Sequence, residues 1–254
     1  LTIRYQGIPL ALHVIPLRNE NGTRVAPVTR VQFDTLVYRV NQVFRGTGLR
    51  FVLDPANWQP RADSILNLDK PGMQARGNAL ADTLSGRILL LLRFGGDTTA
   101  TGNGNAYPPP GAGPKPPSVN DTDQRYVALP NLFVPGNGLD LGGGSFVAHE
   151  LGHYLGLYHT FPGWSEVPGP VFAVADTSGA RIRTAIRAYL TANGGDINAF
   201  DGDSLADTPP DPGTSALKGA GVNMCTTNVI TFPASGADTA VTFRPDTRNV
   251  MSYY

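Results

Sequence analysis

The sequence predicts an α+β fold in which a central sheet is combined with helices and long irregular connections. Short apolar segments at residues 10–17, 49–53 and 86–94 have the length and composition of strands that enter a sheet. Residues 29–44 instead repeat apolar side chains at three- and four-residue spacings, which predicts a helix with one buried face. The 30 glycines and 22 prolines indicate many turns rather than a helical bundle.

The other segments complete this prediction. Residues 95–120, which include the proline-rich stretch 108–117, are expected to form an exposed insertion loop. Two further helices are predicted, one at residues 145–154 with Ser145 as its N-cap and one at residues 181–190. We expect the remaining sequence to be mostly irregular.

Composition and charge exclude several classes of function. Twenty basic residues balance twenty acidic ones, so no net field attracts nucleic acid or an anionic membrane surface. The apolar run at residues 88–92 is far shorter than the roughly 20 residues that span a bilayer. Cys225 is the only cysteine, which rules out an intrachain disulfide. We therefore expect no nucleic-acid partner and no membrane partner.

The residues that carry chemistry lie between His149 and His159. His149 and His153 are four residues apart, so on a helix both imidazoles project from one face, about 6 Å apart. Gly156 can adopt positive φ at little cost, which lets the chain turn so that His159 approaches the same ion from another direction. Three neutral imidazoles are a zinc ligand set that leaves a fourth position for water.

Glu150 follows the first of these ligands and is expected to face the open position. Zinc lowers the pKa of a bound water to about 7, so Glu150 can take a proton from that water as general base. It can later return the proton to a leaving amine as general acid. The motif therefore predicts zinc-dependent hydrolysis.

The length of the motif makes a chance occurrence improbable. A bare His-Glu-x-x-His string also arises on helices as a simple surface pair. The longer string is more specific, because it fixes three histidines, a glutamate and a glycine within residues 149–159. His13, the remaining histidine, lies in an apolar strand and is predicted to be a packed core residue rather than a ligand.

The extended histidine motif resembles that of the metzincin zinc metallopeptidases. The segment Asn249-Val250-Met251-Ser252-Tyr253 is similar to the methionine-containing turn of that superfamily. Within it, Thr160-Phe161 after the third histidine and the segment from Gly202 to Pro209 are similar to the pappalysin family. The resemblance implies a metzincin-like zinc-peptidase fold. Such a fold has a mixed, mostly parallel twisted sheet with backing helices above an active-site cleft, and an irregular lower subdomain with a methionine turn.

The resemblance also implies an organisation of the chain and two further site residues. Residues 1–254 would form a single catalytic domain, with an upper subdomain over residues 1–156 and a lower one over residues 157–254. Met251 would form the hydrophobic floor beneath the imidazoles. Tyr253 would either ligate the zinc or donate a hydrogen bond to the oxyanion.

Calcium is the second cofactor that the resemblance implies. Its expected ligands are the carboxylate of Asp203, the carbonyl of Leu205 and Thr208, which offer the hard oxygen atoms that calcium prefers. Asp196, Asp201 or Asp211 would complete the site. The alternative is a solvated acidic loop without an ion.

The leading interpretation is a secreted, monomeric zinc metalloendopeptidase that hydrolyses internal bonds of a peptide or protein substrate. The substrate would bind as an added strand along the sheet edge. The start at Leu1, without Met or a signal peptide, predicts removal of a preceding segment. The alternatives are a catalytically silent, zinc- and calcium-stabilised binding module of the same fold and a zinc hydrolase with a non-peptide substrate. Glu150 and Tyr253 favour an enzyme.

Overall fold

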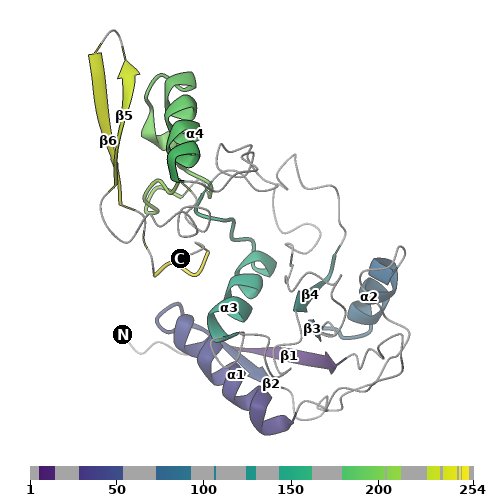
Figure 1. Cartoon of the computed structure of the whole chain (residues 1–254). Helices are drawn as coiled ribbons and strands as arrows, with labels where there is room; N and C mark the ends of the chain where they lie inside the picture. Colours follow the sequence, from purple (N-terminus) through teal and green to yellow (C-terminus); the bar gives the residue numbers. More distant parts are fainter. Residues whose placement is uncertain are drawn as a thin grey trace. The chain divides into compact units, whose positions relative to one another are not determined.

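A computed structural model describes the elements that position the candidate site (Figure 1). The described residues are 6–14, 29–53, 73–92, 106, 124–129, 143–161, 179–203, 205–212, 228–234, 237–244, 246 and 248–251. The chain divides into two compact units. The first comprises Leu1–Gly113 and Thr122–Gly156, and the second comprises Pro114–Asp121 and Leu157–Tyr254.

The first unit is built around a four-stranded sheet with strand order β2-β1-β3-β4. Its strands are β1 (Gln6–Val14), β2 (Leu49–Leu53), β3 (Ile88–Leu92) and β4 (Tyr126–Leu129). Every described pairing in this sheet is parallel. Parallel neighbours need crossover connections, and helix α1 (Arg30–Val43) lies in the connection from β1 to β2.

Strands β3 and β4 are buried on both faces of the sheet. Leu89 and Leu91 of β3 form a core cluster with Tyr126 and Ala128 of β4. Leu90, between the two leucines of that cluster, is fully buried too, although its side chain points to the opposite face. The clustered face also receives side chains from α2 (Met73–Asp82) and the turn after it, namely Leu80, Ala81 and Leu84. This burial explains why β3 is a continuous apolar run.

Helix α1 confirms the helix predicted at residues 29–44. Thr29 and Gln32 form a capping box at its start, with the backbone N–H of Gln32 donating to the Thr29 hydroxyl at 3.2 Å. The predicted apolar face is buried, and the chain leaves the helix through Gly46 and Gly48, which have φ of 97° and 81°. The buried residues are Phe33, Leu36, Val37 and Val40. Helix α1 contacts both β2 and α3.

Helix α3 (Gly143–Tyr154) carries the histidine motif and contacts α1 and β4. It begins two residues before the predicted start, so the prediction of Ser145 as N-cap was wrong, and Ser145 lies within the first helical turn. Val147, Ala148 and Leu151 are buried, which packs the helix into the first unit. Its position is therefore fixed by the same core as the sheet.

The second unit contains α4 (Gly179–Ala192), the short 3₁₀ helix η2 (Ile197–Phe200) and an antiparallel hairpin. The hairpin strands are β5 (Asn228–Ala234) and β6 (Ala237–Phe243), and β5 contacts α4 (Figure 1). The expectation of mostly irregular structure after α4 was wrong at this hairpin. Fully buried Phe200 makes edge-on ring contacts with Tyr189 and Phe243, which joins α4, η2 and β6 in one core.

The remaining sequence predictions differ in outcome. The described elements agree with a combination of sheet and helices. A mixed, mostly parallel sheet was expected, and the described pairings of the main sheet are all parallel. The predicted insertion loop lies outside the described residues apart from Ala106, which is buried. His13 lies in β1, as predicted. In the described part of the chain, no helix has the length and apolar character needed to cross a membrane.

Candidate metal centre

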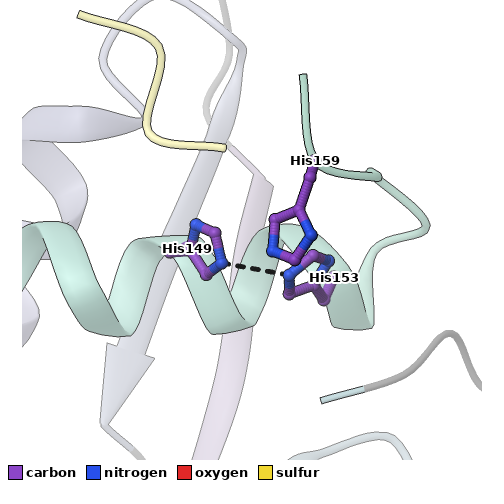
Figure 2. Close-up of side chains that lie close together, drawn as sticks. All are labelled: His149, His153 and His159. Atoms are coloured by element: carbon purple, nitrogen blue, oxygen red, sulfur yellow. Dashed lines mark hydrogen bonds between the residues drawn. The ribbon is translucent and has the colours of Figure 1, made fainter. Parts of the chain in front are cut away.

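His149 and His153 project from one face of α3 (Figure 2). Their one-turn spacing brings the two Nε2 atoms to 3.0 Å from each other, with the ring centroids 4.6 Å apart and nearly perpendicular planes. The residues are 6% and 9% exposed. The helix therefore presents two nitrogen ligands to one point in a sheltered environment.

A sharp turn after α3 returns the chain towards this point. The backbone N–H of Leu155 donates to the Leu151 carbonyl, and that of Gly156 donates to the His153 carbonyl at 3.0 Å. Gly156 has φ of 98°, a conformation that other L-residues rarely adopt. His159 follows this turn and is 5% exposed.

Together the three imidazoles form a group that could hold a metal ion. Each of them offers one nitrogen atom, and these atoms all lie within 4.8 Å of one another. A tetrahedral zinc ion with Zn–N bonds of about 2.0–2.1 Å separates two ligand nitrogens by about 3.3–3.4 Å. The Nε2 atoms of His149 and His153 are close to this separation at 3.0 Å, and the third nitrogen lies within 4.8 Å of both, so the group could hold such an ion.

The chemistry of the donor set also fits a divalent cation. When neither Nε2 carries a proton, the lone pairs of His149 and His153 face each other at 3.0 Å, and a cation between them removes the repulsion. Without a cation, one of the two atoms must carry a proton to make this contact favourable. Imidazole is a common ligand of zinc and of other transition metals.

Glu150 is adjacent to the first histidine on α3 and is 4% exposed. Removing an ionised carboxylate from water is costly unless hydrogen bonds or a nearby cation compensate for the loss. Its position on the ligand-bearing helix makes it the acidic side chain nearest in sequence to the histidine cluster. Among the described residues, Glu150 is therefore the candidate for proton transfer at this site.

The segment that follows His159 is held by three other parts of the second unit. The Thr160 backbone N–H donates to the Met251 carbonyl at 3.4 Å, and its carbonyl accepts from the Gly202 N–H at 3.2 Å. Its hydroxyl donates to Oδ2 of Asp211 at 2.7 Å. Phe161 stacks on the His159 ring, with centroids 4.9 Å apart and planes 9° from parallel. No such role was predicted for Thr160, although its place directly after a ligand is the signal that could have identified it.

Met251 is buried and lies at the end of a local turn. The Asn249 side chain accepts a hydrogen bond from the Met251 backbone N–H, and the Asn249 N–H donates to the Asp246 carbonyl. The Met251 backbone carbonyl accepts the hydrogen bond from the Thr160 N–H, so the turn is connected to the segment that follows the third histidine. Tyr253, the other residue predicted near this turn, lies outside the described residues.

Asp203, Leu205 and Thr208 lie close together in one loop of the second unit. The Asp203 carboxylate accepts a hydrogen bond from the Leu205 backbone N–H at 3.0 Å, and the Leu205 carbonyl accepts from the Thr208 N–H. Burial raises the pKa of Asp203, and the charge of Asp201 adds to this rise. Hydrogen bonds from Leu205 and from the Thr208 side chain act in the opposite direction.

An open pocket of about 270 Å³ lies beside this loop. It is lined by Asn198, Asp201 and the residues from Leu205 to Pro210. Among the described residues, the histidine cluster is the only group of three or more His, Cys, Asp or Glu side chains with ligand atoms this close together. In the described part of the chain, the carboxylates near the predicted calcium ligands therefore do not form a cluster of three. Asp211, one of the three residues that could complete the calcium site, accepts a hydrogen bond from the Thr160 hydroxyl.

Comparison with protein-family models finds no match to this chain, and a search of curated proteins finds no similar protein. The functional assignment therefore rests on the residues of the candidate metal centre and on their geometry.

Proposed function

We propose that this chain is a zinc-dependent metalloendopeptidase of the metzincin type, most similar to the pappalysin family. The observation that carries the proposal is the group of three buried imidazoles with Glu150 beside the first of them. The spacing of these four residues, with the glycine turn between the second and third histidines, supports a peptidase over an unrelated metal site. The substrate would be an extended peptide paired with a sheet edge.

In this proposal the residues of the chain divide the work of hydrolysis. His149, His153 and His159 hold the zinc through imidazole nitrogens. A bound zinc ion supplies Lewis acidity, which polarises the scissile carbonyl and lowers the pKa of water to about 7. The Glu150 carboxylate accepts a proton from the attacking water and returns it to the nitrogen of the leaving amine. Tyr253 would donate a hydrogen bond to the oxyanion.

We also propose that the loop of Asp203, Leu205 and Thr208 binds calcium. The support is their proximity in one loop and the adjoining pocket, which Leu205, Thr208 and Asp201 line. Extracellular calcium is high enough to fill sites with dissociation constants of about 10⁻⁴–10⁻³ M. A calcium-dependent loop therefore fits a secreted, monomeric enzyme with peptide or protein substrates.

The test compares cleavage of an unfolded protein by wild type and by Glu150→Gln, with equal zinc content shown for both. The variant keeps the size of the side chain but cannot accept the proton, so we expect cleavage to fall by about 10²–10⁴-fold. Asp34→Asn is the matched control, because it neutralises an exposed carboxylate on α1. It is expected to cleave as wild type does.

The other outcomes of this assay favour other functions. Equal cleavage by both proteins would remove Glu150 from the mechanism. Zinc binding without cleavage by either protein would favour the silent binding module. Turnover of small esters without turnover of peptides would favour a zinc hydrolase with another substrate class.

A further inference from the structure

We propose that Asp211 is a positioning residue for the third metal ligand and that it acts through its hydrogen bond to Thr160. This inference rests on the zinc centre of the proposed function. It assigns Asp211, one of three residues named as able to complete the calcium site, a role at the histidine cluster.

The contact between the two side chains has the features of a strong hydrogen bond. The Thr160 hydroxyl lies 2.7 Å from Oδ2 of Asp211, and the two residues are 2% and 1% exposed. Bonds from a hydroxyl to an ionised carboxylate are short and about twice as strong as bonds between neutral groups. In a buried setting, loss of the donor removes one of the bonds that compensate for the desolvation of the carboxylate.

Asp211 is itself anchored in the core of the second unit. Its backbone N–H donates to the Phe200 carbonyl at 3.1 Å, and Phe200 packs between Tyr189 and Phe243. The backbone of Asp211, which carries the carboxylate, is therefore held in place by this hydrogen bond. Thr160 therefore contacts a buried residue that is joined to the core of its own unit.

The backbone on the other side of Thr160 is also fixed. Gly202 donates its N–H to the Thr160 carbonyl, and a Cβ atom at Gly202 would collide with the backbone of Phe161. Only glycine permits this close approach. Thr160 is thus held by backbone contacts with Gly202 and Met251, and by the side-chain contact with Asp211.

His159 depends on these contacts more than the other two ligands do. His149 and His153 are placed by the hydrogen bonds of α3, whereas His159 lies in a non-helical segment after Gly156. Its ring is oriented by the stacked Phe161 and by the backbone of its neighbour Thr160. Residues that orient metal ligands in this way typically change metal affinity by about 10–100-fold when they are replaced.

The experiment measures zinc affinity by competition with a chelator, and the visible spectrum of the Co²⁺-substituted protein. Thr160→Val removes the hydroxyl while keeping the shape, and it is expected to weaken zinc binding by about 10–100-fold and to alter the Co²⁺ spectrum. Thr160→Ser retains the hydroxyl and should restore both properties. Asp34→Asn, which removes one exposed charge from α1, should leave both unchanged.

A second variant keeps the test decisive if Thr160→Val folds poorly. Asp211→Asn weakens the same bond from the acceptor side, and we expect it to lower zinc affinity as well. The double variant should lose less affinity than the product of the two single losses, because both substitutions affect one interaction. Independent, multiplicative losses would overturn the proposal.

Two further results separate this proposal from the proposed function. If the wild type binds zinc and cleaves protein, but Thr160→Val and Asp211→Asn retain its zinc affinity and Co²⁺ spectrum, only the positioning role fails. If these variants merely unfold at lower temperature without zinc, with unchanged affinity, the role is structural and the proposal is wrong. A wild type that binds no zinc overturns both proposals.

Discussion

The side chains of the candidate metal centre are held in two different ways. His149 and His153 share a helix, so their separation follows from helix geometry and could be predicted from a four-residue spacing. His159 is placed by a glycine turn and by contacts of Thr160 with residues distant in sequence. The sequence therefore predicted which residues form the cluster, but not what supports the third one. Long-range hydrogen bonds leave no periodic pattern in a sequence.

The raised pKa of Asp203 gives a prediction for pH dependence. An acid whose pKa is higher in the folded state than its ordinary value of 3.8 favours folding at low pH. This contribution to the free energy of unfolding is lost as the pH rises from 3.8 through the raised pKa. Above the raised pKa, the contribution no longer changes with pH. Asp203→Asn should remove this component, so the stability of wild type relative to the variant should fall across that interval.

Calcium should reverse this trend, because it binds the ionised carboxylate. The stabilisation by added calcium is expected to grow as the pH rises through the raised pKa of Asp203, and to be absent in Asp203→Asn. Urea unfolding at a series of pH values, with and without calcium, measures both effects. Asp34→Asn, on α1, controls for the loss of one exposed charge. Equal calcium stabilisation in Asp203→Asn would contradict the proposed ligand.

The secondary-structure elements differ in how well local sequence specifies them. Helix α1 was predictable because it has a capping residue and a regular apolar face. Helix α2 was missed because Gly77 interrupts its pattern. In the fold this glycine is required, since a Cβ atom would collide with the ring of Tyr126. The β5–β6 hairpin was missed, although its β-branched residues flank Ser235-Gly236, a sequence typical of a tight turn.

The turn between α3 and His159 gives a prediction with a matched control. Gly156 and Gly86 have φ of 98° and 72°, and an added Cβ at either position meets no atom within 4 Å. Alanine at either position should therefore cost about 1–2 kcal/mol of unfolding free energy through backbone strain alone. Only Gly156→Ala is expected to weaken zinc binding, because only that turn places a ligand.

Thermal or urea unfolding and a chelator competition assay measure these two properties for both glycine variants. A similar loss of zinc affinity in Gly86→Ala would mean that affinity follows general stability. Unchanged affinity in Gly156→Ala would mean that the turn does not determine the position of His159.

Asn41 of α1 protects the edge strand β2. Its side chain donates to the Phe51 carbonyl at 2.8 Å and accepts from the Phe51 N–H at 2.7 Å, in the manner of a neighbouring strand. Asn41→Ala leaves both backbone groups without these bonds and should lower the free energy of unfolding by about 1–3 kcal/mol. Gln42→Ala, at an exposed neighbouring position, should change it by less than about 0.5 kcal/mol. Equal effects in urea unfolding would contradict the role of Asn41.

At the scale of the whole molecule, the two units differ in how far their structure could be predicted. In the first, apolar strands and a helix with a regular apolar face dominate, and these patterns identify β1, α1, β2 and β3. In the second, the helix predicted at residues 181–190 is confirmed as α4, but the order of the other elements depends on single contacts such as Phe200 with Tyr189 and Phe243. Such contacts join residues far apart in sequence. The irregular connections around them follow from tertiary packing, which local propensity does not specify.

The central claim is that three imidazoles of this chain form one zinc site. X-ray absorption at the zinc edge, on protein loaded with one equivalent of zinc, tests it most directly because it reports the ligands themselves. We expect a first shell at about 2.0–2.1 Å that contains three imidazole nitrogens and one water oxygen, and loss of one imidazole in His159→Ala. A zinc-loaded protein without imidazole scattering, or with the same shell in His159→Ala, would contradict the account.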